Sequence, residues 1–327
     1  MLRSSLLYLS RQKRVFNFIR NVAFARKMAS RFVAGETIES ALEAVKALNA
    51  KGISASLDLL GESVSNEAEA RDTGRQYLDI LDHIDKHGLN ANVSVKLTAL
   101  GQDISDTLCV DTVRGVLERA KRYNSFVRLD MESSAYTDRT LDLFEQRLYA
   151  DFPVNVGIVL QSALRRTLGD VDRANKLKCR VRICKGAYLE PPDVAFPDKA
   201  DVDKNYVAAM HRLMAHGNYP GIATHDEAII AEAKRFAKEQ GIANDRYEFQ
   251  MLYGVRRDLQ DGLVEDGYRI RVYVPFGTQW YPYLMRRLAE RPANLAFMTA
   301  NIVKELVGGS KKAKSIGKGV AASNGTH

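Results

Sequence analysis

Eight short β-rich runs follow one another along the sequence, and each is followed by a longer segment with helical periodicity. The runs are ISASLDLLG (53–61), NVSVKLTALG (92–101), SFVRLDME (125–132), VNVGIVLQS (154–162), CRVRICKGAY (179–188), GIATHDE (221–227), YEFQMLYG (247–254) and RIRVYVPFG (269–277). A regular strand-then-helix alternation is typical of parallel sheets whose crossover helices cover the strands. Eight such units predict an α/β fold, a closed (βα)8 barrel of the TIM type. An open doubly wound sheet would more often have a GxGxxG turn after its first strand, and this sequence has none there.

The segments on either side of this alternation have a different composition. Residues 36–50, ETIESALEAVKALNA, have helical periodicity, and we expect residues 1–50 to form a basic helical segment packed on or near the barrel. The catalytic barrel is expected over residues 51–307. Residues 308–327 are rich in Gly, Ser and Lys and predict a flexible basic tail.

Positive charge is concentrated at the amino end of the chain. The first 35 residues contain eight Lys or Arg and no acidic residue, whereas the other 292 residues carry 40 basic and 40 acidic side chains. The balanced body excludes a basic nucleic-acid-binding domain. Three interpretations of the amino end stay open: a basic amphipathic helix on an anionic membrane surface, a transit peptide, or a helix packed on the body with a solvated basic face. No apolar stretch is long enough to predict a transmembrane helix.

The cysteines and histidines give little support to a metal site. Cys109, Cys179 and Cys184 lack CxxC or metal-finger spacing, which fits a reducing compartment without a disulfide framework. His83 and His87 lie four residues apart, but no carboxylate is spaced to complete a zinc site. We therefore expect no metal.

Polar residues recur where the predicted strands end, and barrels of this type carry their active sites at the carboxyl ends of the strands. These residues are Lys96, Asp130, Glu132, Gln161, Arg182, Lys185, Thr224, His225, Asp226 and Tyr273. Each alone also fits a structural role: Lys96 and Asp130 could form a buried ion pair across neighbouring strands. Arg182 and Lys185 also fit solvent-facing loop charges. The whole set, contributed by most of the strands at one level, indicates a functional site.

Two adjacent arginines, Arg286 and Arg287, lie in the helix-like stretch QWYPYLMRRLAERPAN (279–294). Adjacent arginines on a helix with one buried face are costly unless an anion receives them. The stretch therefore predicts an anion-binding site.

From about residue 36 to about residue 307 the sequence resembles the proline dehydrogenase family, flavin-dependent enzymes of the first step of proline catabolism. The resemblance rests on the motifs VSVKLTALG, RLDMES, VLQS, RICKGAYLEP, ATHDE, FQMLYGVR and YVPFGTQWYPYLMRRLAERPAN. One such motif is weak evidence, whereas seven in order and at barrel spacing are specific. The length is similar to that of the single-function bacterial form rather than to a fusion with a second dehydrogenase domain.

The resemblance implies a binding site for L-proline. It places Arg286 and Arg287, aided by Lys96, on the proline carboxylate, which planar guanidinium groups match well. Glu290 would lie near the flavin and the substrate, and its spacing allows a same-face ion pair with one of the arginines.

Further substrate contacts are implied at the strand ends. Tyr273 and Leu252 would line the ring side of the pocket, and Asp130 would contact the site beside Lys96. Glu62 matches a glutamate that closes over the site by pairing with an arginine.

The resemblance also implies FAD as the cofactor. Arg182 matches the arginine beside the reactive flavin nitrogen, and with Asp130 it is expected to be catalytic. The other expected FAD contacts are Met131, Gln161, Lys185, Gly186, Ala187, Thr224 and His225. Free backbone N–H groups near a helix start, together with Lys185, suit the pyrophosphate of FAD.

The function that follows is oxidation of L-proline to 1-pyrroline-5-carboxylate by hydride transfer from C5 to the flavin N5, with electrons passed to a quinone. The basic amino end would then make peripheral contact with an anionic membrane, on the inner membrane of an otherwise cytoplasmic protein. Three alternatives remain at this point: oxidation of a related cyclic amino acid such as hydroxyproline, a Schiff-base lyase using Lys185 or Lys96, and a non-enzymatic membrane- or partner-binding protein.

Overall fold

The structure is a computed structural model that describes residues 29–61 and 63–290, with the backbone alone over residues 286–290. Its strands are β1 (Ser54–Leu59), β2 (Ala91–Val95), β3 (Val127–Leu129), β4 (Val156–Gln161), β5 (Arg180–Cys184), β6 (Gly221–Ala223), β7 (Glu248–Leu252) and β8 (Ile270–Phe276). They pair in sequence order, and β8 pairs with β1 in parallel, which closes the barrel. Each strand overlaps the run predicted for it, so the predicted (βα)8 barrel is confirmed.

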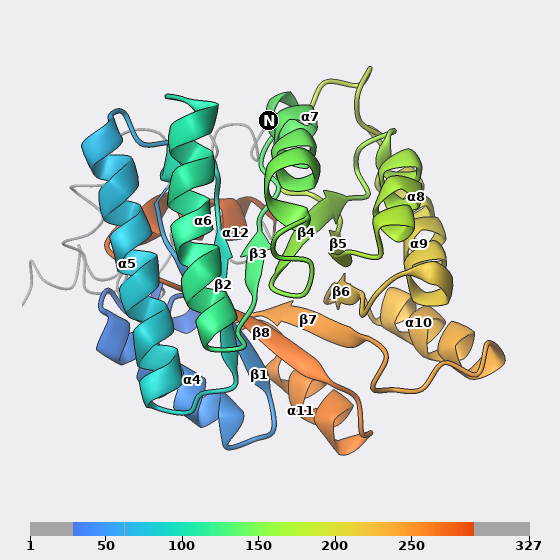
Figure 1. Cartoon of the computed structure of the whole chain (residues 1–327). Coiled ribbons are helices and arrows are strands. Elements are labelled where there is room, and N and C mark those ends of the chain that lie inside the picture. The colour runs from blue at the N-terminus through green and yellow to red at the C-terminus, as the bar shows by residue number, and fades with distance from the viewer. Residues whose placement is uncertain (1–28, 62, 291–327) are drawn as a thin grey trace, which may run out of the picture. The chain divides into compact units, whose positions relative to one another are not determined.

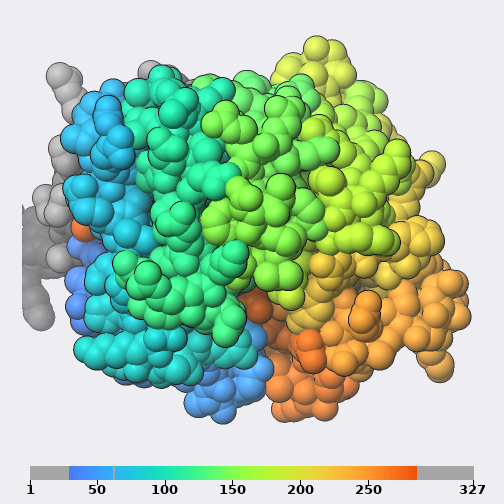
Figure 2. Space-filling model, in the orientation of Figure 1, coloured from blue at the N-terminus to red at the C-terminus, as the bar shows by residue number. Residues whose placement is uncertain are grey.

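Helices alternate with the strands and surround them (Figure 1). They are α4 (Ile38–Asn49), α5 (Glu67–Lys86), α6 (Asp106–Arg122), α7 (Ser134–Leu143), α8 (Thr167–Leu177), α9 (Lys199–His216), α10 (Glu227–Glu239) and α11 (Arg257–Glu265), with a 3-10 turn η1 (Thr98–Leu100) and a π-helical turn η2 (Phe144–Tyr149). A further helix, α12 (Trp280–Glu290), follows β8 in the sequence. Polar side chains fix several helix starts: those of Asn66 and Ser105 accept bonds from the backbone N–H groups of Glu69 and Leu108. On the face seen in Figure 2 the helix side chains close over the strands.

The helix predicted over residues 36–50 is present as α4. Its Ala41, Leu42 and Val45 are buried, and it packs against β1 and β8. The remainder of the predicted N-terminal segment (residues 1–28) and the predicted tail (308–327) lie outside the described residues, so these boundaries stay predictions.

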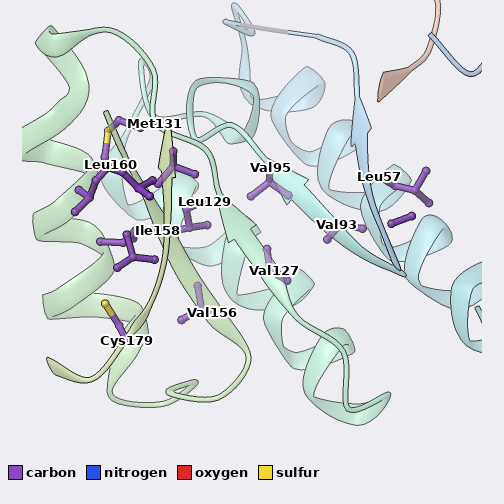
Figure 3. Packing of buried hydrophobic residues seen from close by; sticks show 14 of the residues in the cluster. Leu57, Val93, Val95, Val127, Leu129, Met131, Val156, Ile158, Leu160 and Cys179 are labelled. Atoms are coloured by element: carbon purple, nitrogen blue, oxygen red, sulfur yellow. The ribbon is translucent and has the colours of Figure 1, made fainter. Parts of the chain in front are cut away.

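The apolar core lies between the strands and the helices. Successive residues of a strand face opposite sides of a sheet, so one alternate set of each strand packs outward. Leu57, Val93, Val95, Val127 and Leu129 belong to this set and are buried (Figure 3). The helices contribute buried Leu, Ile and Val to the same cluster.

The other alternate set faces the barrel interior and is largely polar. Ser94 of β2 bonds to Arg182 of β5, and these strands are not neighbours, so the bond crosses the interior. Ser56 and Asp58 of β1 are buried on the same side. The interior of this barrel therefore holds a charged and hydrogen-bonded network, and the layer between strands and helices supplies most of the apolar burial.

Residues Val33–Thr278 form one compact unit that contains the barrel. Helix α12 belongs to a second unit and is described by itself. Within the described residues, no helix combines the length and apolar character needed to cross a membrane.

Candidate active site

Arg182, on β5, is at the centre of the interior network. Its Nε donates to Oε1 of Gln250 at 2.5 Å, Nη1 to Oδ1 of Asp130 at 2.8 Å, and Nη2 to Oγ of Ser94 at 3.1 Å. Its side chain is only 8% exposed. Because partners on β2, on β7 and just after β3 hold all three nitrogens, the guanidinium is fixed in place.

Asp130 connects Arg182 to Tyr273 of β8. Its Oδ2 accepts the Tyr273 hydroxyl at 2.8 Å, and the Arg182 guanidinium lies 5.3 Å from the centre of the Tyr273 ring. Burial, reinforced by the negative charges of Asp130 and Asp58, raises the pKa of Tyr273 well above its ordinary value. Tyr273 is therefore a neutral donor whose ring covers one side of the cation.

Lys96, which follows β2, pairs with Asp58 of β1. Its Nζ donates to Oδ1 of Asp58 at 2.8 Å, and the two side chains are 10% and 1% exposed. The suggested pairing of Lys96 with Asp130 is therefore wrong, because Asp130 pairs with Arg182 instead. Burial raises the pKa of Asp58, Lys96 opposes that rise, and the charge of Asp130 adds to it.

A second ion-paired group forms around Lys185, just after β5. Its Nζ lies 2.6 Å from Oδ1 of Asp203 and 2.9 Å from Oδ2 of Asp226. The hydrogen bond from Lys185 lowers the pKa of Asp226. The Lys185 side chain is 28% exposed whereas Arg182 is buried, so the interpretation of both residues as solvent-facing loop charges is wrong for Arg182.

Hydrogen bonds link several of the other predicted cofactor residues at the strand ends. Gln161 donates through Nε2 to the carbonyl oxygen of Met131 at 3.2 Å. Thr224 Oγ1 accepts the backbone N–H of Asp226, and His225 Nε2 accepts that of Leu252 at 3.0 Å. Since Nε2 accepts, a neutral His225 ring carries its proton on Nδ1.

Gly186 and Ala187 continue the chain after Lys185. Gly186 has φ +101°, a conformation that L side chains rarely adopt. A Cβ there would lie 3.4 Å from the Cβ atoms of Ala163 and Gln161. Glycine thus supplies the left-handed turn that leads out of β5.

The predicted arginine pair lies on α12, as the sequence pattern indicated. The structure describes only the backbone of Arg286, Arg287 and Glu290, so the roles of their side chains stay predictions. The same holds for Glu62, which lies outside the described residues. Among the residues that the structure does describe, no group of three or more His, Cys, Asp or Glu side chains is placed to hold a metal ion.

Several members of the network escaped the sequence analysis, among them the buried Asp58, Glu248 and Gln250 and the partly buried Arg271. Each alternates with apolar residues in its strand, as in SLDL, EFQML and IRVYV. That period of two, with polar residues on the inner face of several strands, was the signal that could have identified them.

The arrangement can stabilise negative charge. Arg182 and Lys96 are buried cations held by carboxylates, and a fixed guanidinium needs little reorganisation to stabilise an anion that forms beside it. The amines of Lys96 and Lys185 are each held by carboxylates, Asp58 for the first and Asp203 and Asp226 for the second, and this disfavours the Schiff-base alternative, which needs an accessible amine nucleophile.

The comparisons with known proteins give a consistent result. A family model described as proline dehydrogenase matches residues 41–300. A proline dehydrogenase of Deinococcus radiodurans is 45% identical over 281 residues, which are 85% of this chain and 90% of the relative. Proline dehydrogenase 1 of Bacillus subtilis is 42% identical over 306 residues, 93% of this chain and 100% of the relative.

Solved structures show the same fold. Proline utilization A of Bdellovibrio bacteriovorus, inactivated by N-propargylglycine, matches with a TM-score of 0.77 and 28% identity over 85% of this chain. A Bradyrhizobium japonicum proline utilization A variant matches with a TM-score of 0.71 and 28% identity over 84% of this chain. The chain spans about a third of each of these longer proteins, 34% and 32%.

Proposed function

The chain belongs to the proline dehydrogenase family, and we propose that it oxidises L-proline to 1-pyrroline-5-carboxylate with FAD as its cofactor. The observation that carries the proposal is the buried Arg182 of β5, held on all three guanidinium nitrogens in the barrel interior. A fixed cation in a barrel interior suits a reaction that delivers a hydride, and thus negative charge, to a neighbouring group.

The residues fit FAD in the chemistry of their donors. Arg182 is a buried guanidinium with five N–H groups, and the bonds to Gln250, Asp130 and Ser94 use three of them. Lys185, at the rim, is accessible to solvent and suits the pyrophosphate. Next to it, Gly186 has no side chain of its own, so the backbone there can approach a ligand closely. The chemistry that bound FAD would supply is a hydride acceptor for C5 of proline, from which the electrons would pass to a second acceptor.

The substrate carboxylate needs cations, and we assign this role to Arg286, Arg287 and Lys96. For Lys96 the structure offers support, because its ammonium is buried and oriented by Asp58. When the substrate carboxylate binds Lys96, the proline ring is held in a fixed position in the site. Such positioning lowers the barrier to the reaction. Tyr273 and Leu252 are the residues that we assign to the proline ring.

The local charge also favours the reactive form of the substrate. Proline must lose its amine proton as well as the hydride, and neighbouring cations disfavour a protonated amine. Arg182 and Lys96 are buried cations of the site; Asp130 and Asp58, which pair with them, offset part of this charge, and the neutral Tyr273 adds none. We assign the catalytic roles to Arg182 and to Asp130, which holds both Arg182 and Tyr273.

Turnover with L-proline and an artificial electron acceptor tests this function. The product, trapped by o-aminobenzaldehyde, should appear with L-proline and require FAD. Faster turnover with trans-4-hydroxy-L-proline would show that this compound, rather than L-proline, is the substrate. No turnover with either compound would refute the proposal.

We further propose a quinone as the final acceptor and a peripheral membrane contact through the basic residues 1–35. Lys and Arg near an anionic surface contribute about 1 kcal/mol each, and added salt screens that attraction. Co-sedimentation with anionic liposomes should therefore be weaker in high salt and in a variant that lacks residues 1–35. Equal binding by both proteins would rule out this segment as the contact.

A further inference from the structure

A hydrogen-bonded series of four polar side chains, three of them buried and Arg271 partly buried, runs through the barrel interior and ends at Arg182. Arg271 of β8 donates through Nε to Oε1 of Glu248 at 2.8 Å. Gln250 donates through Nε2 to the same oxygen at 2.6 Å, and its Oε1 accepts Nε of Arg182 at 2.5 Å. Glu248 and Gln250 are two residues apart on β7 and therefore share its inner face.

The chemistry of the two ends leaves the Gln250 amide only one orientation. An ionised carboxylate only accepts hydrogen bonds, and a guanidinium only donates them. The amide has to direct its NH2 to Glu248 and its oxygen to Arg182, because the reverse would place two donors together at one end and two acceptors at the other. Glu248 thus determines which atom of Gln250 meets Arg182.

Glu248 remains ionised in this setting. Its burial alone would raise its pKa, but Arg271, Gln250 and Arg128 outweigh that and bring the pKa below its ordinary value. Arg271 is itself anchored, since its Nη1 donates to the Ala55 carbonyl at 2.8 Å and to Oδ1 of Asn92 at 2.9 Å. The Arg271 end of this hydrogen-bonded series is thus fixed to β1 and β2.

Gly221 of β6 provides the room for the Gln250 amide. A Cβ at Gly221 would overlap Nε2 of Gln250 and lie 2.9 Å from its Cδ. Because Gln250 is held at both ends by hydrogen bonds, it could yield to an added methyl group only by breaking one of them.

We propose that Glu248, acting through Gln250, is a positioning residue for Arg182 in the oxidation of proline. This rests on the proposed function, in which Arg182 stabilises the charge of the reduced flavin. A guanidinium whose Nε has no acceptor can rotate away from its place, and misplacement of about 1 Å can cost roughly 100-fold in rate.

The test compares the full-length, FAD-loaded wild type with Glu248→Gln and Gly221→Ala. The first substitution removes the charge that orients Gln250, and the second displaces Gln250 without changing any charge. Both should lower the midpoint potential of the bound flavin, because the reduced form loses stabilisation by Arg182. Both should also lower kcat for proline roughly 10- to 100-fold while KM stays within about twofold.

Tyr219→Phe is the matched control. The Tyr219 hydroxyl lies 3.2 Å from Oε2 of Glu248, the oxygen that does not contact Gln250. This variant should keep the potential and kcat of the wild type.

The outcomes separate this inference from the proposed function. A wild-type potential in a folded Glu248→Gln or Gly221→Ala protein, with only the melting temperature reduced, would overturn the positioning role. So would a Tyr219→Phe protein that shifts as much as the other two. A wild type that binds no FAD, or whose flavin proline does not reduce, would instead refute the proposed function.

Discussion

Nζ of Lys96 lies 2.8 Å from Oδ1 of Asp58, and both side chains are buried on the inner side of the barrel. Asp58 of β1 is level with Ser94 of β2, and Lys96 is the next inward-facing residue after Ser94. The lysine proposed for substrate binding is therefore held by a carboxylate from the neighbouring strand. The two residues should act as one unit.

This coupling predicts the result of a double-mutant cycle. Lys96→Met should raise the KM for proline about tenfold, because a charge-assisted bond to the carboxylate is lost. Asp58→Asn should also raise KM, since it removes the carboxylate charge that Nζ of Lys96 contacts. The double variant should bind proline no worse than Lys96→Met, because Asp58 acts through Lys96.

The cycle requires steady-state kinetics on the four proteins and their thermal unfolding as a check on folding. If the effects of the two substitutions on KM were strictly additive, Lys96 and Asp58 would not act as one unit. Normal proline KM in Lys96→Met would remove Lys96 from the substrate site.

The ion pair of Glu248 with Arg271 predicts a pH dependence of stability. The folded-state pKa of Glu248 lies below its ordinary value of 4.5, so its ionised form stabilises the fold above that pH. This contribution is lost as the pH falls below 4.5 through the folded-state pKa. Glu248→Gln should lower the free energy of unfolding by on the order of 3 kcal/mol at pH 7, and this deficit should shrink in acid.

Denaturant unfolding of wild type and Glu248→Gln at pH 7 and below pH 4.5 measures this difference. A deficit that stays constant or grows as the pH falls would show that Glu248 is not a stabilising carboxylate.

Gly157 of β4 should be intolerant of a side chain. A Cβ there would overlap the Arg180 carbonyl oxygen and lie 2.8 Å from Nη1 of Arg128, which donates to that oxygen at 2.7 Å. Gly157→Ala should destabilise the protein by about 1–3 kcal/mol, as overpacking does. The measurement is the midpoint of thermal or denaturant unfolding.

Gly115, within α6, is the matched control because a Cβ there would meet no atom within 4 Å. Gly115→Ala should stabilise the protein by about 0.5–1 kcal/mol, since alanine loses less conformational entropy in a helix. Equal destabilisation by both alanines would contradict the interpretation of Gly157 as a packing position.

The architecture could be predicted from the sequence, whereas the pairing within the interior could not. Runs such as VNVGIVLQS and RIRVYVPFG indicate strands through local preference and alternate with helical segments, and this specifies a barrel. Which inward residues meet depends on the register of neighbouring strands. Lys96 was paired with Asp130 for that reason, although the β1–β2 register brings it to Asp58.

The network residues that were not predicted from the sequence were missed for another reason. Glu248 and Arg271 have no motif of their own, and their meaning comes from contact with each other across β7 and β8. Arg182, by contrast, lay in a recognisable motif, and the structure shows that it is buried and bonded through all three guanidinium nitrogens. Resemblance thus identified single residues, while the network that holds them became visible only in the fold.

The most direct test of the account is an absorption spectrum of the purified full-length protein, recorded before and after anaerobic addition of L-proline. A flavin-dependent proline dehydrogenase should show the bands of oxidised flavin in the first spectrum and their bleaching in the second. A flavin spectrum that proline leaves unchanged would contradict proline as the substrate. A colourless protein that FAD cannot reconstitute would contradict the flavin chemistry assigned to this barrel.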